Sequence, residues 1–333
     1  MKTVFVINPM AGQGKDIGGL VEKIRETAVK IKKETAIYIT KYAGDAERFV
    51  KEYCENHGPA RFIACGGDGT LGEVVNGVFN CTGAEVGVYP IGTGNDFKRN
   101  FKNTDAFFDI EAQLCGSAEC CDAIRYTTEL DGVKKTGYGI NMFNIGFDCN
   151  VADMTARMKE KPFISVCLSY LLSVFAVLIR KKGANLEIEL DGAKMHSGKL
   201  LLTSIANGKF CGGGIQSNPL ADVRDGLINI NIIYNISRLN FLTKFPFYAK
   251  GTHVKLKNIE KIIFSTKCRK ISVTPIDGKM RICTDGEIFD AGKTEFEIEL
   301  WLKTNQYTIY RRKGKKSAKQ KKKPFKNGEK RLT

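Results

Sequence analysis

The chain has 333 residues, 43% of them hydrophobic and 26% charged, which excludes a generally disordered protein and favours about two globular domains. Of the formal net charge of +16, residues 311–333 contribute +11, from twelve Lys or Arg and one Glu, so residues 1–310 carry only +5. A Lys-rich end of this kind suits an acidic membrane surface or nucleic acid.

The first hundred residues alternate short apolar runs with helical patterns. We predict strands over Thr3–Ile7, Ala36–Thr40, Arg61–Cys65 and Glu85–Tyr89, and helices over Asp16–Ile31, Asp45–Asn56 and Leu71–Phe79. Because helical segments separate the strands, we expect crossover connections and a parallel sheet that is covered on both faces. Residues 1–120 are therefore predicted to form a doubly wound α/β domain.

After about residue 120 the pattern changes to runs that alternate apolar and polar residues, which is typical of antiparallel sheet. These runs are Lys199–Ala206, Leu227–Tyr234, Ile259–Ser265, Lys270–Pro275 and Thr294–Trp301. Helical patterns interrupt them near Val151–Lys182 and Arg238–Lys250. We predict an antiparallel β-sandwich domain over residues 121–310, followed by a disordered Lys/Arg-rich tail over residues 311–333.

Within the second domain, the seventeen residues Phe163–Ile179 carry no charge. This length is borderline for a transmembrane helix and three serines interrupt the run, so we predict a buried or lipid-facing helix. The eleven cysteines include no C-x-x-C pair, so no cysteine metal site is expected. Since no signal-peptide pattern precedes the first strand, we expect a cytoplasmic protein whose thiols are reduced and mostly lie in the core.

The strongest local motif is Cys65-Gly-Gly-Asp-Gly-Thr-Leu-Gly-Glu73, which follows a predicted strand and opens a helix. The spacing of Thr70 and Glu73 predicts a capping box at the helix start. Glycines there would let phosphate oxygens reach backbone N–H groups at the positive end of the helix dipole. Asp68 could act on such an anion only through a metal, a water or another cation. A tight glycine turn without a ligand is the alternative.

Two further glycine-bearing loops follow strands of the same predicted sheet. Residues Asn8–Lys15 follow the first strand, and Pro90–Phe97 follow the fourth. Neither the Walker A spacing nor a dinucleotide fingerprint is present, so each loop alone could be a plain turn. Because ligands of open α/β sheets bind at the carboxyl ends of the strands, three such loops together favour a nucleotide site.

Three later segments combine glycines with carboxylates or amides. They are Ala206–Gly214, Pro219–Leu227 and Thr284–Glu287. Since Asp-Gly is a common hairpin signal, the spacing alone predicts turns that carry carboxylates.

Together these segments resemble the diacylglycerol kinase catalytic family, in particular the soluble bacterial lipid kinases, which are also similar to sphingosine and ceramide kinases. The resemblance covers about residues 1–305 and rests on five motifs in the family's order: Asn8-Pro9 with Gly12 and Gly14, Gly66–Thr70, Gly92–Phe97, Asn207–Gly214 with Pro219–Gly226, and Asp285–Glu287. The Gly66–Thr70 turn alone would not decide, because NAD kinases share it. The resemblance implies an ATP- and Mg²⁺-dependent enzyme that phosphorylates a lipid hydroxyl, with diacylglycerol as the expected acceptor.

The resemblance also implies a set of nucleotide and metal ligands. ATP would be held by Asn8, Pro9, Met10, Ala11 and Gly12, by Thr40, by Gly66, Gly67, Asp68, Gly69, Thr70, Leu71, Gly72 and Glu73, and by Thr93, Asn95 and Asp96. Mg²⁺ would lie on the Asp225 carboxylate and on the backbone carbonyls of Asp222 and Leu227, which are oxygen ligands that a hard cation accepts. Asp68, Asp96 and Asp122 would form an acidic, water-linked network between the loops, the metal and ATP.

Glu287 matches the family's proposed general base, and Asp68 is the second residue expected to be catalytic. A lipid alcohol is a poor nucleophile until its proton is accepted, and a carboxylate beside the hydroxyl supplies the acceptor. Most of the rate enhancement is expected from positioning and from cations at the phosphates. Lys15 or Arg99 could supply such charge, although solvated surface positions are the alternative for both.

Access to a lipid that stays in the bilayer requires contact with the membrane. The basic tail could hold the protein reversibly at an anionic surface, or it could be a solubilising tail without a partner. Nucleic acid is disfavoured because the tail lacks interleaved aromatic residues. The sequence does not decide whether the protein forms a homodimer. Alternative acceptors are a sphingoid base, ceramide, phosphatidylglycerol or, for an NAD kinase-like enzyme, a soluble substrate. The non-enzymatic alternative is a membrane-binding adaptor.

Overall fold

The N-terminal part of the protein is built on a parallel sheet. In this computed structural model, which describes residues 1–12, 16–146, 183–285 and 287–304, the strands lie in the order β4–β3–β1–β2 and all run parallel. They are β1 (Thr3–Ile7), β2 (Thr35–Ile39), β3 (Arg61–Gly66) and β4 (Glu85–Pro90). The crossovers contain α1 (Ile17–Lys30), α2 (Asp45–His57) and α3 (Asp68–Gly77). The chain moves outward from β1 in both directions, so the loops after β1 and β3 diverge at the switch point where such sheets bind ligands.

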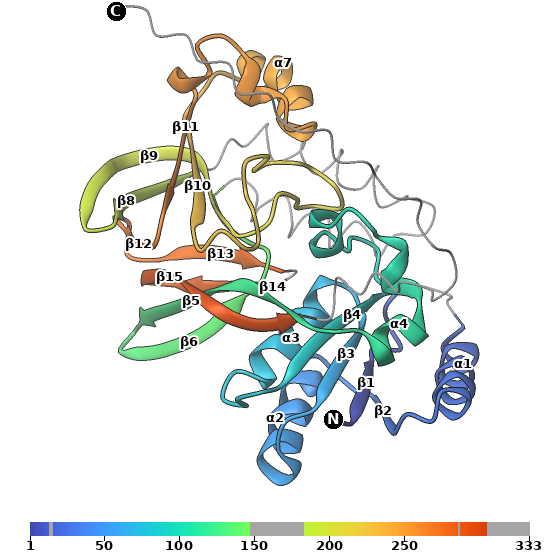
Figure 1. Cartoon of the computed structure of the whole chain (residues 1–333). Helices are drawn as coiled ribbons and strands as arrows, with labels where there is room; N and C mark the ends of the chain where they lie inside the picture. Colours follow the sequence, from blue (N-terminus) through green and yellow to red (C-terminus); the bar gives the residue numbers. More distant parts are fainter. Residues whose placement is uncertain (13–15, 147–182, 286, 305–333) are drawn as a thin grey trace, which may run out of the picture.

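Helices cover both faces of this sheet, with α1 on one side and α2 and α3 on the other (Figure 1). In β1, Val4 and Val6 belong to the buried cluster that contains α2 and α3 side chains, whereas Phe5 and Ile7 belong to the cluster with α1. All four side chains are fully buried. A strand that is buried on both faces explains the unbroken apolar run, and the predicted doubly wound α/β fold is confirmed.

The start of α3 differs from the prediction. The helix begins at Asp68 behind the N-cap residue Gly67, and no side chain caps it. The predicted capping box is wrong because both side chains have partners elsewhere in the fold. Thr70 Oγ1 accepts a hydrogen bond from Asn8 Nδ2 at 3.1 Å, and Glu73 Oε2 accepts one from the backbone N–H of Ala46 at 3.1 Å.

After β4, short helical turns lead into a β-rich second part. The turns are η1 (Phe97–Asn100), η2 (Asp105–Phe108) and α4 (Ile110–Cys115). The strands are β5 (Glu119–Leu130), β6 (Val133–Gly139), β7 (Met142–Gly146), β8 (Ala184–Leu190), β9 (Ala193–Ala206), β10 (Ile228–Tyr234), β11 (Ile263–Cys268), β12 (Lys270–Pro275), β13 (Met280–Thr284), β14 (Glu287–Ala291) and β15 (Lys293–Thr304). Between β10 and β11 lie α7 (Arg238–Ala249), η3 (His253–Lys255) and η4 (Ile259–Lys261).

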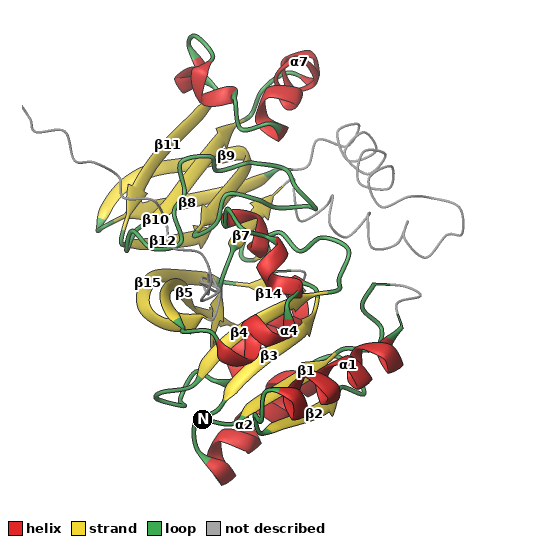
Figure 2. Ribbon diagram, turned by 45° about the vertical axis from the view of Figure 1, so that its right-hand side comes forward, coloured by secondary structure: helices red, strands yellow, loops and turns green. Residues whose placement is uncertain are grey.

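The strands of this second part pair antiparallel with one another, as predicted (Figure 2), and their buried side chains form one large cluster and a smaller one beneath α7. Phe143 and Phe296 are fully buried in the large cluster, with their ring centroids 5.0 Å apart. β15 joins the two parts, because it pairs antiparallel with β5 and β12 and pairs parallel with β4 near its end. The domain division near residue 120 stays a prediction.

Several smaller predictions of the sequence need correction. The predicted strand Ile259–Ser265 begins only at Ile263, because η4 takes its first residues. Among the described cysteines, all of which are free, Cys65, Cys121 and Cys268 are buried, and Cys54 and Cys81 pack half-buried against the core. No helix in the described ranges is long and apolar enough to cross a membrane. The predicted helix near residues 151–182, the apolar run within it and the basic tail lie outside the described residues.

Candidate active site

The loop after β1 is tied to the loop after β3. The backbone N–H of Asn8 donates to Cys65 O at 2.9 Å, and its side chain donates to Thr70 as described above. Asn8 Oδ1 also accepts a hydrogen bond from Met10 N at 2.9 Å, a local turn that shapes the first loop. Met10 itself is exposed, and Gly12 has a left-handed φ of 74°. The predicted first ligand loop therefore lies beside the Gly66–Thr70 turn.

The loops after β3 and β4 are in direct backbone contact. The N–H groups of Ile91 and Gly92 both donate to Gly66 O at 3.0 Å. A Cβ atom on Gly92 would lie 2.3 Å from Gly67 Cα, and one on Gly66 would lie 2.3 Å from Thr70 Oγ1. Both distances are too short for any side chain. Glycine at these positions therefore lets the two loops close on the first turn of α3.

Asp68 holds the third loop against this helix. Its two carboxylate oxygens accept hydrogen bonds from the backbone N–H groups of Asp96 at 3.0 Å and Phe97 at 3.1 Å. Asn95 adopts a left-handed φ of 51°, and its side-chain amide donates to Gly92 O at 2.6 Å. Thr93 is exposed between them at the tip of the loop. The predicted site residues of the second and third loops thus meet through Asp68.

Asp96 connects these loops to the second part of the chain. Its Oδ2 accepts a hydrogen bond from Gly213 N at 2.8 Å, and its Oδ1 lies 3.4 Å from Arg99 Nε. Burial and the nearby charge of Asp68 raise the pKa of Asp96 to about 6, although the Gly213 N–H and the Arg99 charge act in the opposite direction. Arg99 therefore lies beside Asp96 at the site. The sequence alone left open whether Arg99 is a site residue or a solvated surface residue. Lys15 lies outside the described residues.

A second contact across the two parts comes from Asp285. Its backbone oxygen lies 3.5 Å from the position of a Cβ on Gly69, and its own Cβ lies 3.7 Å from that of Gly72. The residue has a left-handed φ of 42°, and its carboxylate accepts the backbone N–H of Ile140 at 2.8 Å. Burial, together with the charge of Asp68, raises the pKa of Asp285 to about 7. The sequence indicates only that Asp285 belongs to a turn. Its contacts with α3 and its hydrogen bond to Ile140 depend on the fold.

Glu287, the predicted general base, follows Asp285 at the start of β14 and is exposed. Burial and the charge of Glu287 together raise the pKa of the Glu47 carboxyl in α2. The Glu287 carboxylate is therefore close enough to Glu47 to interact with it electrostatically, while the Asp68 carboxylate holds the third loop. The turn that carries Glu287 meets the first turn of α3, where Asp285 lies beside Gly69 and Gly72.

Asparagine side chains hold the two parts together beneath the site, namely Asn207, which belongs to a motif noted in the sequence, and Asn100 and Asn141, which the sequence did not single out. Asn207 Nδ2 donates to Asp122 O and to Ile140 O, both at 2.8 Å. Asn100 Nδ2 donates to Asn141 Oδ1 at 3.2 Å. These amide hydrogen bonds hold the segment after β9 against β5 and the residues just before β7, and hold those residues against the loop after β4. Only the motif Asn207-Gly208 hinted at this in the sequence.

The predicted metal ligands lie on one turn. Asp225 Oδ1 accepts a hydrogen bond from Leu227 N at 3.0 Å, and Asp225 Oδ2 pairs with Lys267 Nζ at 2.5 Å. Beneath the turn, Asp122 Oδ2 accepts the N–H of Gly226 at 2.8 Å. Burial raises the pKa of Asp122 to about 6, with the Asp225 and Asp222 charges adding to the effect. Side-chain clusters of three or more acidic, His or Cys residues that could hold a metal are absent from the described residues.

Three other predicted ligands have limited freedom to contact a nucleotide. Leu71 is buried in the core, and its backbone N–H donates to Gly67 O at 3.1 Å. Glu73 is bound to Ala46, as described above. Thr40 is buried, and its backbone N–H donates to Ile7 O at 2.9 Å at the carboxyl end of the sheet. The Leu71 and Glu73 side chains therefore hold α3 in place, against the core and against α2, rather than facing the loops of the site.

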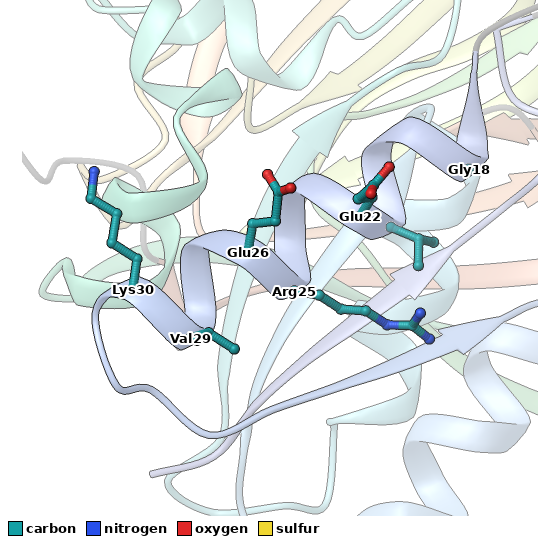
Figure 3. A pocket seen from close by; sticks show the side chains of 7 residues that line it. Gly18, Glu22, Arg25, Glu26, Val29 and Lys30 are labelled. Atoms are coloured by element: carbon teal, nitrogen blue, oxygen red, sulfur yellow. The ribbon is translucent and has the colours of Figure 1, made fainter.

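An open groove on the outer side of α1 is separate from these loops (Figure 3). Its lining comprises Gly18, Val21, Glu22, Arg25, Glu26, Val29 and Lys30. Figure 3 shows Glu22 and Glu26 pointing to one side of the helix and Arg25 to another. None of the predicted site residues lines this groove, so the candidate site is the junction of loops around α3.

Comparison with known proteins agrees with this geometry. The diacylglycerol kinase catalytic domain family matches residues 2–125, and the YegS C-terminal NAD kinase beta sandwich-like domain family matches residues 141–299. The chain is 31% identical to a probable lipid kinase YegS of Escherichia coli over 236 residues, which cover 69% of this chain and 73% of that protein. This chain belongs to the YegS and diacylglycerol kinase family of lipid kinases.

Other relatives cover more of this lipid kinase. A diacylglycerol kinase of Mycobacterium tuberculosis is 29% identical over 78% of this chain and 81% of its own length. A diacylglycerol kinase of Bacillus subtilis is 27% identical over 85% and 88%. The crystal structure of a diacylglycerol kinase from Bacillus anthracis covers 92% of this chain and 97% of its own, with a TM-score of 0.66 and 19% identity. That structure supports the shared two-part fold.

The raised pKa of Asp285 predicts a specific dependence of stability on pH. In the unfolded chain this carboxyl ionises near pH 4, but in the folded lipid kinase it keeps its proton to about pH 7. The folded state thus binds more protons between these values, so its free energy of unfolding falls as the pH rises through them. In Asp285→Asn this loss should be smaller, by up to about 1.4 kcal/mol per pH unit between the two pKa values.

The measurement is urea unfolding at about pH 5, 6, 7 and 8 without nucleotide or divalent cation. Asp191→Asn is the matched control, because Asp191 is also left-handed, with φ 47°, and also accepts backbone N–H groups, from Arg269 and Lys270, but is exposed. Equal pH dependence in wild type and Asp285→Asn would contradict the assignment.

Proposed function

We propose that this lipid kinase transfers the γ-phosphoryl group of ATP to a lipid hydroxyl, with diacylglycerol as the acceptor. The observation that carries the proposal is the convergence of four segments on the first turn of α3. They are the loops after β1, β3 and β4 and the turn at Asp285. Curated relatives along most of the chain are diacylglycerol kinases, which supports this choice of acceptor.

The phosphates of ATP fit best at the start of α3. This ten-residue helix begins without a side-chain cap, so backbone N–H groups of its first turn remain for an anion, at the positive end of the helix dipole. Gly69 and Gly72 leave room beside them, next to Asp285. The Arg99 guanidinium, which lies beside Asp96 at the same edge, adds a positive charge. In this proposal the first loop closes over the nucleotide from the Asn8 side.

The chemistry needs a proton acceptor and accurate positioning. The lipid oxygen forms a bond to the γ-phosphorus, the bond between that phosphorus and the β–γ bridging oxygen breaks, and ADP leaves. Glu287 accepts the proton of the lipid hydroxyl. Its exposure leaves it accessible to a substrate that arrives from outside, and its neighbour Asp285 fixes the turn that carries it. Positioning of the reactants supplies most of the acceleration in reactions of this class.

Mg²⁺ fits the turn that contains Asp222, Asp225 and Leu227. The donors would be the Asp225 carboxylate and the backbone carbonyls of Asp222 and Leu227, all oxygen atoms, with the buried Asp122 carboxylate beneath them. The accumulation of negative charge that raises the pKa of Asp122 favours a cation there. Lys267, which now pairs with Asp225, would have to move aside. Mg²⁺ bound to ATP would supply charge neutralisation at the phosphates.

One experiment distinguishes diacylglycerol from the other possible acceptors. The second part of the chain matches a family described as NAD kinase-like, which keeps a soluble acceptor in view. Purified protein is incubated with labelled ATP, Mg²⁺ and, separately, diacylglycerol, a sphingoid base, ceramide, phosphatidylglycerol and NAD. We expect labelled phosphatidic acid as the main product. Labelled NADP without any lipid product would overturn the proposal, and a different labelled lipid would correct the acceptor.

Replacement of the general base gives a sharper test of mechanism. Glu287→Gln should lower kcat by about 10²- to 10⁴-fold, because the amide cannot accept the hydroxyl proton. ATP affinity, measured by equilibrium binding, should stay within a few fold of wild type. Glu129→Gln is the control, since Glu129 is also exposed on a strand of the second part but lies away from α3. Wild-type turnover in Glu287→Gln would refute its role.

The basic tail is proposed to strengthen contact with an anionic membrane. Truncation after Tyr310 removes twelve Lys or Arg and one Glu. Each basic residue near an anionic leaflet contributes about 1 kcal/mol at most, so vesicle binding should weaken strongly at low salt and less at high salt. Activity on detergent-dispersed diacylglycerol should stay near the wild-type value. Equal vesicle binding by the truncated and complete chains at low salt would remove the tail from the account.

A further inference from the structure

The net positive charge of the chain is confined to two places. Residues 238–261, which we call the α7 segment, contain α7, η3 and η4 and hold six Lys or Arg against the single acid Glu260. Without this segment and residues 311–333, the chain has thirty-four basic and thirty-four acidic residues, so the remainder is neutral. Figures 1 and 2 both show α7 at the end of the β-rich part farthest from the β1–β4 sheet.

α7 is apolar on two sides. On its inner side, Phe241, Phe245 and Tyr248 pack with Leu202, Ile233 and Ile263 of the sheet. On its outer side, Leu239, Leu242 and Phe247 are 72%, 41% and 43% exposed. At about 100° per residue these three side chains lie within one sector of the helix, together with the exposed Pro246. Apolar side chains that gather on the exposed side of a helix, opposite a side already packed on the sheet, mark an interaction surface, so the outer side calls for a partner.

The remaining polar group of the outer side is satisfied within the helix. The Thr243 hydroxyl lies 3.1 Å from the backbone oxygens of Leu239 and Asn240, so it can donate to either carbonyl. The Thr243 hydroxyl therefore adds no unsatisfied donor to the outer side, and the exposed Asn240 lies at its edge. Val254, in η3, adds a further apolar side chain that is 37% exposed. Transfer of these apolar side chains from water into the bilayer interface is therefore favourable.

The lysines around this surface are not neutralised. Within the described residues, no ion pair joins an acidic residue to Lys244, Lys250, Lys255, Lys257 or Lys261. By contrast, Lys267 in β11, Lys270 in β12 and Lys279 just before β13 each pair with a carboxylate. The α7 segment thus combines exposed hydrocarbon with unpaired positive charge, the composition of helices that lie in a membrane interface.

We propose that the α7 segment docks on an anionic phospholipid bilayer, with Leu239, Leu242 and Phe247 inserted at the level of the headgroups and the lysines on the lipid phosphates. The occupant is argued from charge complementarity. A second copy of this chain would bring the same positive charge to the contact and repel it, whereas an anionic leaflet neutralises it. The proposal deepens the proposed lipid kinase function by naming the surface that meets the substrate's membrane.

The α7 segment is also joined to the candidate active site. At the end of α7, Ala249 O accepts a hydrogen bond from Gln216 N at 2.9 Å. Three residues earlier in the same loop, Gly213 N donates to Asp96 in the third nucleotide loop. One short loop therefore runs from the docking helix to the edge where the phosphates are proposed to bind. Docking of α7 would hold that edge close to the bilayer, where a lipid hydroxyl is presented.

The test compares vesicle binding by the full chain, wild type and variants, without ATP or diacylglycerol. Vesicles contain equal parts phosphatidylglycerol and phosphatidylcholine, and binding is measured by co-sedimentation at high salt, where the contribution of the tail is screened. Leu239→Ser with Phe247→Ser should lower the partition coefficient by about ten-fold or more. Val133→Ser with Met195→Ser is the matched control, since these residues are 69% and 44% exposed in the same part of the chain, and it should bind like wild type.

A charge variant and a spectroscopic variant complete the test. Lys255→Gln with Lys257→Gln should weaken binding to the anionic vesicles at low salt, whereas Lys30→Gln with Lys33→Gln, at exposed positions near the end of α1, should not. In Leu239→Trp, anionic vesicles should shift the tryptophan emission to shorter wavelength relative to the wild-type chain, which has a single tryptophan. Val133→Trp should show no added shift. Thermal unfolding confirms that each variant is folded.

Equal vesicle binding by the Leu239/Phe247 variant and its control would overturn the docking surface. So would an unchanged Leu239→Trp spectrum, or a change in oligomeric state, rather than in vesicle binding, on loss of Leu239 and Phe247. Because no substrate is present, these results are independent of phosphoryl transfer. A protein that phosphorylates lipid but binds vesicles without α7 would refute only the docking surface, and one that docks through α7 but phosphorylates no lipid would refute only the proposed function.

Discussion

The close approach of Gly67 and Gly92 is the constraint on which the candidate site depends. A Cβ on Gly92 would lie 2.3 Å from Gly67 Cα, and one on Gly66 would lie 2.3 Å from Thr70 Oγ1, so the loops after β3 and β4 can touch only because Gly66 and Gly92 carry no side chain. That contact brings the backbone of residues 96 and 97 within hydrogen-bonding distance of Asp68. Because the loop after β4 is held in this way, the Asp96 carboxylate can accept a hydrogen bond from the backbone N–H of Gly213, in the second part of the chain. The site is thus assembled outward from two glycines.

The same assembly collects negative charge in a partly buried place. Asp68, Asp96 and Asp285 all border the start of α3, and burial, with the Asp68 charge adding to it, raises the pKa values of the other two to about 6 and 7. Backbone N–H groups offset part of this cost, since each carboxylate accepts at least one. A fold that keeps such groups together gives up stability where function requires charge. The charge of Arg99 offsets a further part of it at Asp96.

Local patterns predicted the parallel sheet and its loops well, because each depends on neighbours in the sequence. Alternation of short apolar runs with helices predicted the four parallel strands β1 to β4, and Asp16 caps α1 at the predicted start. The capping box failed for a tertiary reason, since Asn8 and Ala46 compete for Thr70 and Glu73. Asp285 and Asn207 were likewise read only as turn or motif residues, because their partners lie more than sixty positions away. Such pairings leave no periodic signal in the sequence.

The separation of charge from the body of the molecule follows a physical logic. A kinase whose nucleotide edge carries several carboxylates cannot also present that edge to anionic lipid without repulsion, so the positive charge has to lie elsewhere on the same side. α7 meets this requirement, because it lies at the far end of the β-rich part yet remains hydrogen-bonded, through Ala249 and Gln216, to the loop that reaches Asp96. The neutral remainder of the chain adds no competing orientation. In the proposed arrangement, the basic apolar end would align the enzyme on the bilayer, while the acidic edge at the start of α3 would stay available for a nucleotide and a cation.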